Sequence, residues 1–328
     1  MHLLSSLSQP SSVVGSQPQL SHFLEGLIMS DQYINLTTDS GMTPLHVAAE
    51  YGQTREAKLL LDHGADMNAI SSLFLKFYDE GHYRSGMTPL HVAVQNGQTE
   101  IAKLLLEYGA NVHAYCSTRG TLGEHSLNEH ITPLHLAVLY GHVETVKLLL
   151  EKGANLHAST ALLDTPIHYA AKAPDIDNMI DNRLEVFELL LARGASLNAV
   201  NKKGYTPFHT AAYCLNWPIV DLLIRMKVNM SFVDDDLDSI LPPLFNGDPI
   251  HAAIDSDYGC DANYVVEQLL QANANVHGRD LKGNTPLHLA AESNSYVSNI
   301  LLEHGADPSA ENRLGETPYD KAVEAELW

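Results

Sequence analysis

Apolar runs recur in pairs along the chain, and each pair predicts two short helices. In one copy, Thr43-Pro44 begins a run containing the small pair Ala48-Ala49, and residues 57–61 form a second run ending near Gly64. Threonine is favoured at the N-cap of a helix and proline in its first turn. Glycine suits the left-handed position after a helix. Each unit is therefore predicted to be two antiparallel helices and a turn, too small to bury its own apolar face.

The tetrapeptide that begins each unit recurs at spacings of 32 to 45 residues. Its copies begin at Thr43, Thr88, Thr132, Thr165, Thr206, Asp248, Thr285 and, in degenerate form, Thr317. The pattern Thr-Pro-Leu-His, Ala-Ala, Leu-Leu-Leu, Gly resembles that of the ankyrin repeat family, whose unit has about 33 residues. The resemblance covers about residues 22–326. It implies an all-α ankyrin-repeat solenoid of about seven helix–turn–helix repeats with β-hairpin-like fingers and capping half-repeats.

Register along the repeats predicts the domain organisation. Residues 1–20, rich in Ser, Gln and Pro, are expected to be a disordered lead-in. We expect an N-terminal capping half-repeat at 21–42, seven repeats with inserted loops at 43–316, and a C-terminal cap at 317–328. A chain of 328 residues suggests two domains at about 150 residues each. The repeat overrules that estimate and predicts a single ankyrin-repeat domain over 21–328.

Insertions lengthen five connections in the array. Those between repeats 1 and 2, 2 and 3, and 5 and 6 gain 12, 11 and 9 residues, and the helix–helix loops of repeats 4 and 6 gain 8 and 4. The resemblance implies that the connections between repeats are fingers on a concave face. The first finger, residues 70–85, contains Phe74, Phe77, Tyr78 and Tyr83. Aromatic residues are typical interface anchors; the alternative is a local minicore packed back on the solenoid.

The resemblance also places variable, partner-reading positions just before the tetrapeptide, after its histidine and after the small pair. These positions hold Tyr51, Tyr140, Tyr169, Lys202, Lys203, Tyr205 and Tyr213. Tyrosine gives a large contact area with a polar group at low entropic cost. We expect these residues to bind a partner, with packing between adjacent fingers as the alternative role for about half of the tyrosines.

Histidine is abundant, but its pattern indicates a structural role. Seven of the 18 histidines belong to the tetrapeptide, and the resemblance implies that they tie neighbouring turns together by hydrogen bonds. The second finger brings together Cys116, Glu124, His125 and His130, but their spacing matches no closed zinc site. No metal ligand is predicted.

An acidic segment at residues 234–238 resembles the start of a calcium loop. Ser239 and Phe245 stand where such a loop requires Gly and Glu, so the match fails. No phosphate-binding loop or nucleophile motif is present in the sequence. We predict no cofactor and no catalytic residue.

Composition narrows the partners and the compartment. Nineteen Lys and Arg oppose 40 Asp and Glu, a net charge of −21, and no basic run exists. Nucleic acid and anionic membranes are therefore poor partners. The three widely spaced cysteines, Cys116, Cys214 and Cys260, indicate a reducing compartment. The sequence contains no bilayer-spanning run and no good secretory signal, so we expect a cytoplasmic monomer.

These observations predict a protein–protein interaction module or adaptor that binds a partner protein without turnover. The alternative is an enzyme or metal-binding protein with a site in the long fingers. Stoichiometric metal or a low-pKa Cys116 thiolate would favour that alternative. The glutamates at 311, 316, 324 and 326 resemble the tails of some secreted bacterial effectors. Export into a host cytosol is thus a second setting for the same function.

Repeat 5 lacks two features of the pattern. Leu215 occupies the position of an inter-helix glycine, and its second helix ends in Met226-Lys227-Val228-Asn229 without a C-terminal glycine. One insertion precedes the next repeat, and another widens the loop between its two helices. Local defects weaken local segments of a solenoid. We therefore expect the fastest amide exchange among the internal repeats at residues 214–262.

Overall fold

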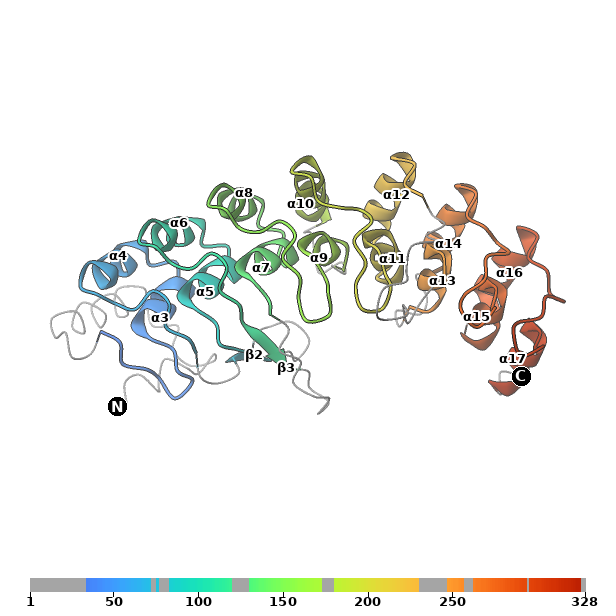
Figure 1. Ribbon diagram of the computed structural model, residues 1–328, viewed down its shortest axis with the longest axis horizontal. Helices are drawn as coiled ribbons and strands as arrows, with labels where there is room; N and C mark the ends of the chain where they lie inside the picture. The colour runs from blue at the N-terminus through green and yellow to red at the C-terminus, as the bar shows by residue number, and fades with distance from the viewer. Residues whose placement is uncertain are drawn as a thin grey trace, which may run out of the picture. The chain divides into compact units, whose positions relative to one another are not determined.

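Helix pairs begin at the repeated tetrapeptide in the computed structural model of the chain, as the sequence predicts (Figure 1). Packing divides the chain into two compact units, unit 1 (Met1–Ala161) and unit 2 (Leu162–Trp328). The structure describes residues 34–71, 75–76, 83–119, 130–172, 180–229, 247–256, 262–293 and 295–325. The prediction of a single domain over 21–328, with its lead-in and caps, stays a prediction.

Unit 1 contains three helix pairs in two layers (Figure 1). Helices α3, α5 and α7 pack side by side in one layer, and α4, α6 and α8 in the other. The elements are α3 (Pro44–Glu50), α4 (Thr54–Asp62), β1 (Leu75–Lys76), β2 (Tyr83–Ser85), α5 (Pro89–Gln95), α6 (Thr99–Glu107), β3 (Ser117–Arg119), α7 (Pro133–Leu139) and α8 (Val143–Glu151).

Unit 2 continues the same arrangement. The first helices α9, α11, α13, α15 and α17 pack in sequence, as do the second helices α10, α12, α14 and α16. The elements are α9 (Pro166–Lys172), α10 (Ile180–Ala192), α11 (Pro207–Tyr213), α12 (Trp217–Arg225), α13 (Pro249–Ile254), α14 (Ala262–Gln271), α15 (Pro286–Ser293), α16 (Ser295–Glu303) and α17 (Pro318–Glu324). The predicted all-α architecture of stacked helix pairs is confirmed.

The tetrapeptide starts each first helix by a reciprocal cap. In α3, the Thr43 hydroxyl accepts the amide hydrogen of His46, and the Thr43 amide donates to the His46 Nδ1 at 3.1 Å. Two amide groups that the helix itself leaves unpaired are thereby satisfied. Pro44 follows at the first helical position, where no amide hydrogen is needed. The same box caps α5, α7, α11 and α17.

The second helices end at a residue with positive φ. Gly64 has φ +85° after α4, and a side-chain carbon added at this position would meet no other atom within 4 Å. The glycine is therefore required for its backbone conformation rather than for close packing. In unit 2, Lys227 (φ 55°) and Asn273 (φ 65°) adopt this conformation after α12 and α14. Leu215 also has positive φ, 54°, in the turn before α12.

The core of each unit lies between the two helix layers. In unit 1, Leu60, Leu105 and Leu149 of the second helices are fully buried, as are Ala48 and Ala49 of α3. The small alanine side chains let neighbouring helices approach closely. Burial of a leucine side chain contributes roughly 1.5–3 kcal/mol. Stability therefore comes from contacts between adjacent helix pairs, as expected for a repeat protein.

The first two insertions form a small antiparallel sheet in unit 1. Strand β1 pairs with β2 within the first finger, and β2 pairs with β3 of the second finger. The second finger is closed at its base by a β-bridge between Cys116 and Ile131. The hairpin predicted for the first finger is confirmed.

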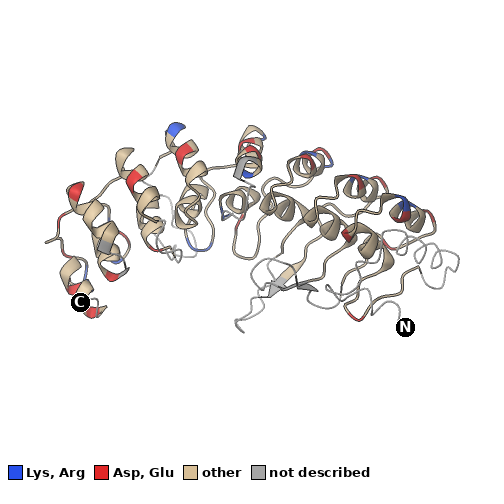
Figure 2. Ribbon diagram, turned by 180° about the vertical axis from the view of Figure 1, so that it is seen from behind, with Lys and Arg blue, Asp and Glu red and all other residues tan. Residues whose placement is uncertain are grey.

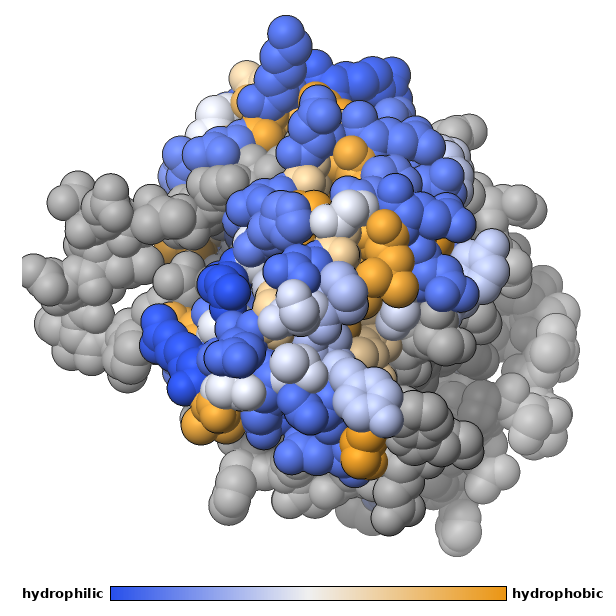
Figure 3. Space-filling view, turned by 90° about the vertical axis from the view of Figure 1, so that its right-hand side faces the viewer, coloured by the Kyte–Doolittle hydropathy of each residue, from blue (hydrophilic) through white to orange (hydrophobic). Residues whose placement is uncertain are grey.

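The end of unit 2 that carries α17 is covered mainly by hydrophilic residues (Figure 3). Hydrophobic side chains are exposed there singly, among them Leu314 and Tyr319. A terminal repeat has no neighbour on one side, and a polar outer surface keeps such an end soluble.

Candidate functional site

The tetrapeptide histidines link successive repeats. Their Nε2 atoms lie 2.8–3.3 Å from a backbone carbonyl oxygen just before the next helix pair. The pairs are His46–Met87, His91–Ile131, His168–Tyr205, His209–Gly247, His251–Asn284 and His288–Glu316. The structural role predicted for these six residues is confirmed.

This hydrogen bonding requires a neutral imidazole. The Nδ1 atom accepts the threonine amide hydrogen, so Nε2 carries the proton that it donates to the carbonyl. Burial lowers the pKa of His46 and of His209 to about 4, and it also lowers the pKa of His168 and of His251. Both ring nitrogens are engaged and the rings are buried, so these histidines have no atom to offer a metal or a substrate.

A buried aspartate supports the finger turn that carries three of the predicted residues, Lys202, Lys203 and Tyr205. Asp164 is only 1% exposed, and its carboxylate forms an ion pair with Lys172 and accepts a hydrogen bond from the Asn201 Nδ2 at 2.8 Å. Asn201 also shapes its own finger turn, because its Oδ1 accepts the amide hydrogens of Lys203 and Tyr205 at 2.9 and 3.0 Å. The carboxylate thereby fixes the finger turn 201–205 against the end of α9.

Two tyrosines and a lysine meet above this turn. The rings of Tyr205 and Tyr213 lie 5.6 Å apart, and the Lys203 Nζ lies 5.8 Å and 5.1 Å from their respective centroids. The Lys172 Nζ lies 4.9 Å from the centroid of the Tyr169 ring. A cation within about 6 Å of an aromatic face is attracted by the ring quadrupole, by roughly 0.5–1 kcal/mol at exposed sites. We call Lys203 and Tyr213 the lysine–tyrosine cluster.

The predicted contact residues of this region differ in exposure. Tyr169 and Tyr205 are only 7% and 5% exposed, so in the unbound chain their rings contribute to packing. Lys202 and Lys203 are exposed, and Tyr213 is half-buried. Little of the surface of these two tyrosines is accessible, and their contact with a partner stays a prediction.

The sequence did not predict a role for Lys172, Asp164 or Asn201. Asn201 stands five residues before the threonine of its repeat, and Asp280 and Asn312 stand at the same offset. Each of these residues accepts backbone amide hydrogens across its own turn. The recurrence of Asn or Asp at this offset is the signal that could have located the finger turns and their supports.

Two further predicted contact residues belong to unit 1. Tyr51 is 52% exposed at the end of α3. Tyr140 is half-buried and stacks on His142 with ring centroids 6.1 Å apart, while the His142 Nε2 lies 3.0 Å from the carbonyl oxygen of Gln95. The Tyr140 ring thus stacks on a histidine that is hydrogen-bonded to the preceding helix pair.

The aromatic first finger falls largely outside the described residues. Phe74, Phe77 and Tyr78 lie outside them, so their role as anchors or as a minicore stays a prediction. Tyr83 lies in β2, where its backbone is paired with Lys76 and Arg119.

No feature of the described residues forms a metal or nucleophile site. No group of three His, Cys, Asp or Glu side chains is placed there to hold a metal. Cys116 is buried beside Ile131, whereas Glu124 and His125 lie outside the described residues, as do Asp234–Asp238. Burial raises the pKa of the Cys214 thiol to about 11, so it is protonated at neutral pH.

Charged residues lie mainly on the second helices and at finger turns in both units (Figure 2). The first helices are largely uncharged between their caps and their ends. Across the described segments, no helix is both long enough and apolar enough to cross a bilayer.

Helix pairs capped by a recurring tetrapeptide, stacked through their small residues and joined by turns, define a tandem-repeat helical protein. Family models described as ankyrin repeats (3 copies) match residues 16–116, 120–198 and 250–326, and one described as ankyrin repeats (many copies) matches residues 179–224. These matches cover more than half of the chain. The chain belongs to the ankyrin repeat family, which is a non-catalytic fold that mediates protein–protein interaction.

Individual relatives match shorter segments. Human "Protein fem-1 homolog A" is 37% identical over 82 residues, which are 22% of this chain and 12% of that protein. "Putative ankyrin repeat protein FPV031" of fowlpox virus is 33% identical over 107 residues, 32% of this chain and 28% of that protein. Delta-latroinsectotoxin-Lt1a of Latrodectus tredecimguttatus is 56% identical over 39 residues, 12% and 3% respectively. Each match spans less than a third of the relative.

Proposed function

We propose that this protein is a binding scaffold that holds a partner protein against the finger turns and adjoining ends of the first helices, without catalysing a reaction. The observation that carries the proposal is the lysine–tyrosine cluster of unit 2. It combines an exposed ammonium group, a partly exposed aromatic ring and a buried anchor, Asp164.

The cluster has the properties of a preorganised contact site. Lys203 is held over Tyr213 by the cation–π contact, and the turn beneath it is fixed through Asn201 and Asp164. Holding a side chain in place before binding lowers the entropy lost on association, which is roughly 0.5–1.5 kcal/mol per immobilised side chain. The ammonium group has three donors, so Lys203 can donate to an acceptor on the partner while its charge lies over the Tyr213 ring.

The first finger supplies a separate proposed contact surface in unit 1. We define Phe74, Phe77 and Tyr78 as the finger triad; Tyr83, Tyr51 and Tyr140 complete the contact residues proposed there. Support comes from the 52% exposure of Tyr51 and from the sheet that holds the backbone of Tyr83. Aromatic anchors of this kind commonly carry most of the binding energy of an interface.

Site-specific crosslinking in living cells tests the proposed surface. A photoreactive phenylalanine derivative at Tyr213 is expected to crosslink a defined partner. The control places the same group at Tyr296, which is 62% exposed on the second helix α16. Identical products from both positions, or none from Tyr213, would contradict the proposal.

We place this function in the cytoplasm and assign it to a monomer. The support is that Cys116 and Cys214, two of the three cysteines, form no disulfide, as is usual in a reducing compartment. A translocation reporter fused to the chain tests export into a host cytosol, and sedimentation equilibrium tests the monomer.

A further inference from the structure

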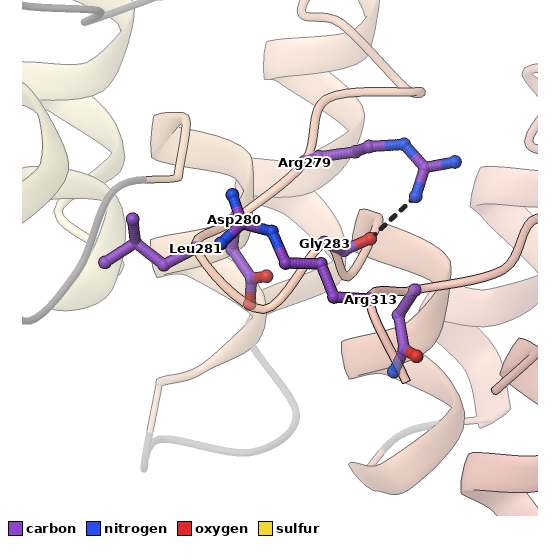
Figure 4. A pocket seen from close by; sticks show the side chains of 6 residues that line it. Arg279, Asp280, Leu281, Gly283 and Arg313 are labelled. Carbon is purple, nitrogen blue, oxygen red and sulfur yellow. Dashed lines mark hydrogen bonds between the residues drawn. The ribbon is translucent and has the colours of Figure 1, made fainter. Parts of the chain in front are cut away.

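Two neighbouring finger turns in unit 2 enclose a pocket of about 280 Å³ (Figure 4). The turns are residues 280–284 and 312–316. They are joined by a hydrogen bond from the Asn312 Nδ2 to the Asn284 Oδ1 at 2.9 Å, and by one from the Arg313 amide to the Lys282 carbonyl oxygen at 3.0 Å. The pocket is thus built from backbone that both turns hold in place.

Two arginines line this pocket. The Arg279 Nη1 donates to the carbonyl oxygens of Gly283 at 2.9 Å and Glu311 at 2.6 Å, which fixes the guanidinium and leaves its Nε and Nη2 hydrogens for a ligand. The Arg313 side chain runs across the first turn, where a methyl group at Gly283 would come within 2.9 Å of its Cγ (Figure 4). Among the described residues, no carboxylate forms an ion pair with either guanidinium.

The acidic groups nearby are already engaged. Asp280 also lines the pocket, but its Oδ1 accepts the amide hydrogens of Lys282 and Asn284 at 2.8 Å, and its Oδ2 accepts from the Asn284 Nδ2 at 3.1 Å. Asp307 interacts electrostatically with Arg279. Its Oδ1 accepts two hydrogen bonds from Ser309, and these are the main reason for its lowered pKa. Both carboxylates keep their charge, but the lining itself holds two arginines against one aspartate, so its net charge is positive.

Apolar surface lies beside the two arginines. Leu281 lines the pocket and is 37% exposed, and Leu314, at the tip of the next turn, is 79% exposed. A volume of about 280 Å³ is just below the usual range for small-molecule sites, about 300–1,000 Å³. It suits one side chain of a partner better than a cofactor.

We propose that this pocket binds a carboxylate side chain of an acidic peptide segment in the partner, with an apolar neighbour of that residue resting on Leu281 or Leu314. Arginine matches a carboxylate because its fixed fork of donors allows two parallel hydrogen bonds. The proposal rests on the proposed function and names the chemistry of the partner at this site.

The net charge of −21 does not oppose this assignment at physiological salt. Charges separated by more than about 8 Å are largely screened at 0.15 M ionic strength, so the two arginines dominate inside the pocket. Repulsion from the rest of the chain returns at low salt. Lowering the salt concentration is therefore expected to raise the affinity for an acidic peptide by less than two arginines in a neutral protein would.

Nuclear magnetic resonance of the full chain with ¹⁵N-arginine tests the proposal. The chain has eight arginines, so few side-chain Nε–H signals need assignment. The probe is the peptide acetyl-Gly-Ser-Leu-Glu-Leu-Ser-Gly-amide, and its partner control carries Gln in place of Glu. We expect the Glu peptide to shift the signals of Arg279 and Arg313 saturably, and the Gln peptide to bind at least tenfold more weakly.

Variants separate the pocket from general electrostatics. Arg313→Gln is expected to weaken Glu-peptide binding at least fivefold, whereas Arg193→Gln, which removes the same charge from an exposed position after α10, changes it less than twofold. Equal binding of the Glu and Gln peptides, or equal loss in both variants, would overturn the proposal. Tenfold tighter binding of a phosphoserine peptide would overturn the carboxylate assignment. Each of these results leaves the crosslinking test at Tyr213 unaffected, so the two proposals fail separately.

Discussion

Replacing Lys227 by glycine is expected to stabilise repeat 5. Lys227 has φ 55° after α12, and its amide donates to the Ile224 carbonyl oxygen at 2.9 Å. Gly64 ends α4 in the same way, with φ +85° and a hydrogen bond to Leu61 at 3.1 Å. The lysine side chain is exposed and makes no ion pair within the described structure, so glycine removes little besides the strain of its backbone.

The size of this effect follows from two opposing terms. A non-glycine residue in the left-handed region loses roughly 1–2 kcal/mol relative to the right-handed one. Glycine in turn gives the unfolded chain more freedom, which costs about 0.4–1 kcal/mol of stability. The net expectation for Lys227→Gly is a stabilisation of about 0.5–1 kcal/mol.

The reverse change in unit 1 is the matched control. Gly153 ends α8 with φ +86°, and a side-chain carbon built there meets nothing within 4 Å. Gly153→Ala therefore introduces backbone strain without a clash. We expect it to lower stability by about 1 kcal/mol.

Amide hydrogen exchange measures both changes where they act, because a repeat protein can open locally. Since 1.4 kcal/mol corresponds to a factor of ten, Lys227→Gly should slow exchange of the α12 amides about two- to fivefold. Gly153→Ala should speed exchange in α8 by about fivefold. Faster exchange in α12 of the glycine variant, or no change at either site, would refute the assignment of strain to Lys227.

Three further predictions concern the framework and the first finger. Burial raises the pKa of Asp248 to about 6, above its value in the unfolded chain. As the pH rises from about 4 to 6, the free energy of unfolding of the wild type should therefore fall by about 1–2 kcal/mol relative to that of Asp248→Thr. Equal pH dependence of the two proteins in urea unfolding would contradict this. Thr132→Ala should lower the free energy of unfolding by about 1 kcal/mol because it removes a helix cap. Leu149→Ala should lower it by about 2–5 kcal/mol because the leucine side chain is fully buried. Small losses of similar size for both variants in urea unfolding would refute the register assigned to this repeat. Replacing the finger triad by serine should weaken partner binding and shift the thermal midpoint little, whereas a collapse of the midpoint would identify a minicore.

The fold could be predicted because each repeat encodes its own local structure. Thr43, Pro44 and His46 specify a cap whose geometry depends on residues only three positions apart. Such a short motif can be recognised in the sequence, and its recurrence along the chain makes the prediction more specific. The positive φ of Leu215 and Lys227 could be expected for the same reason, because glycine occupies the equivalent positions in other repeats.

The candidate site was harder to predict because it depends on contacts between repeats. Asp164 and Asn201 are separated by 37 residues, and their hydrogen bond arises only when two turns stack. Burial is likewise a property of the assembled layers. Tyr205 and Tyr213 look alike in the sequence, yet Tyr205 is buried and Tyr213 is half-buried.

The affinity for the partner crosslinked at Tyr213 tests the binding function most directly. Isothermal titration calorimetry would compare the wild type with the double variant Lys203→Gln/Tyr213→Ser and with the control Lys152→Gln/Tyr296→Ser, whose two positions are exposed elsewhere. We predict at least a tenfold loss of affinity for the first variant and less than a twofold change for the control. Equal affinities for all three proteins, each shown to be folded by its thermal midpoint, would contradict a partner site at the lysine–tyrosine cluster.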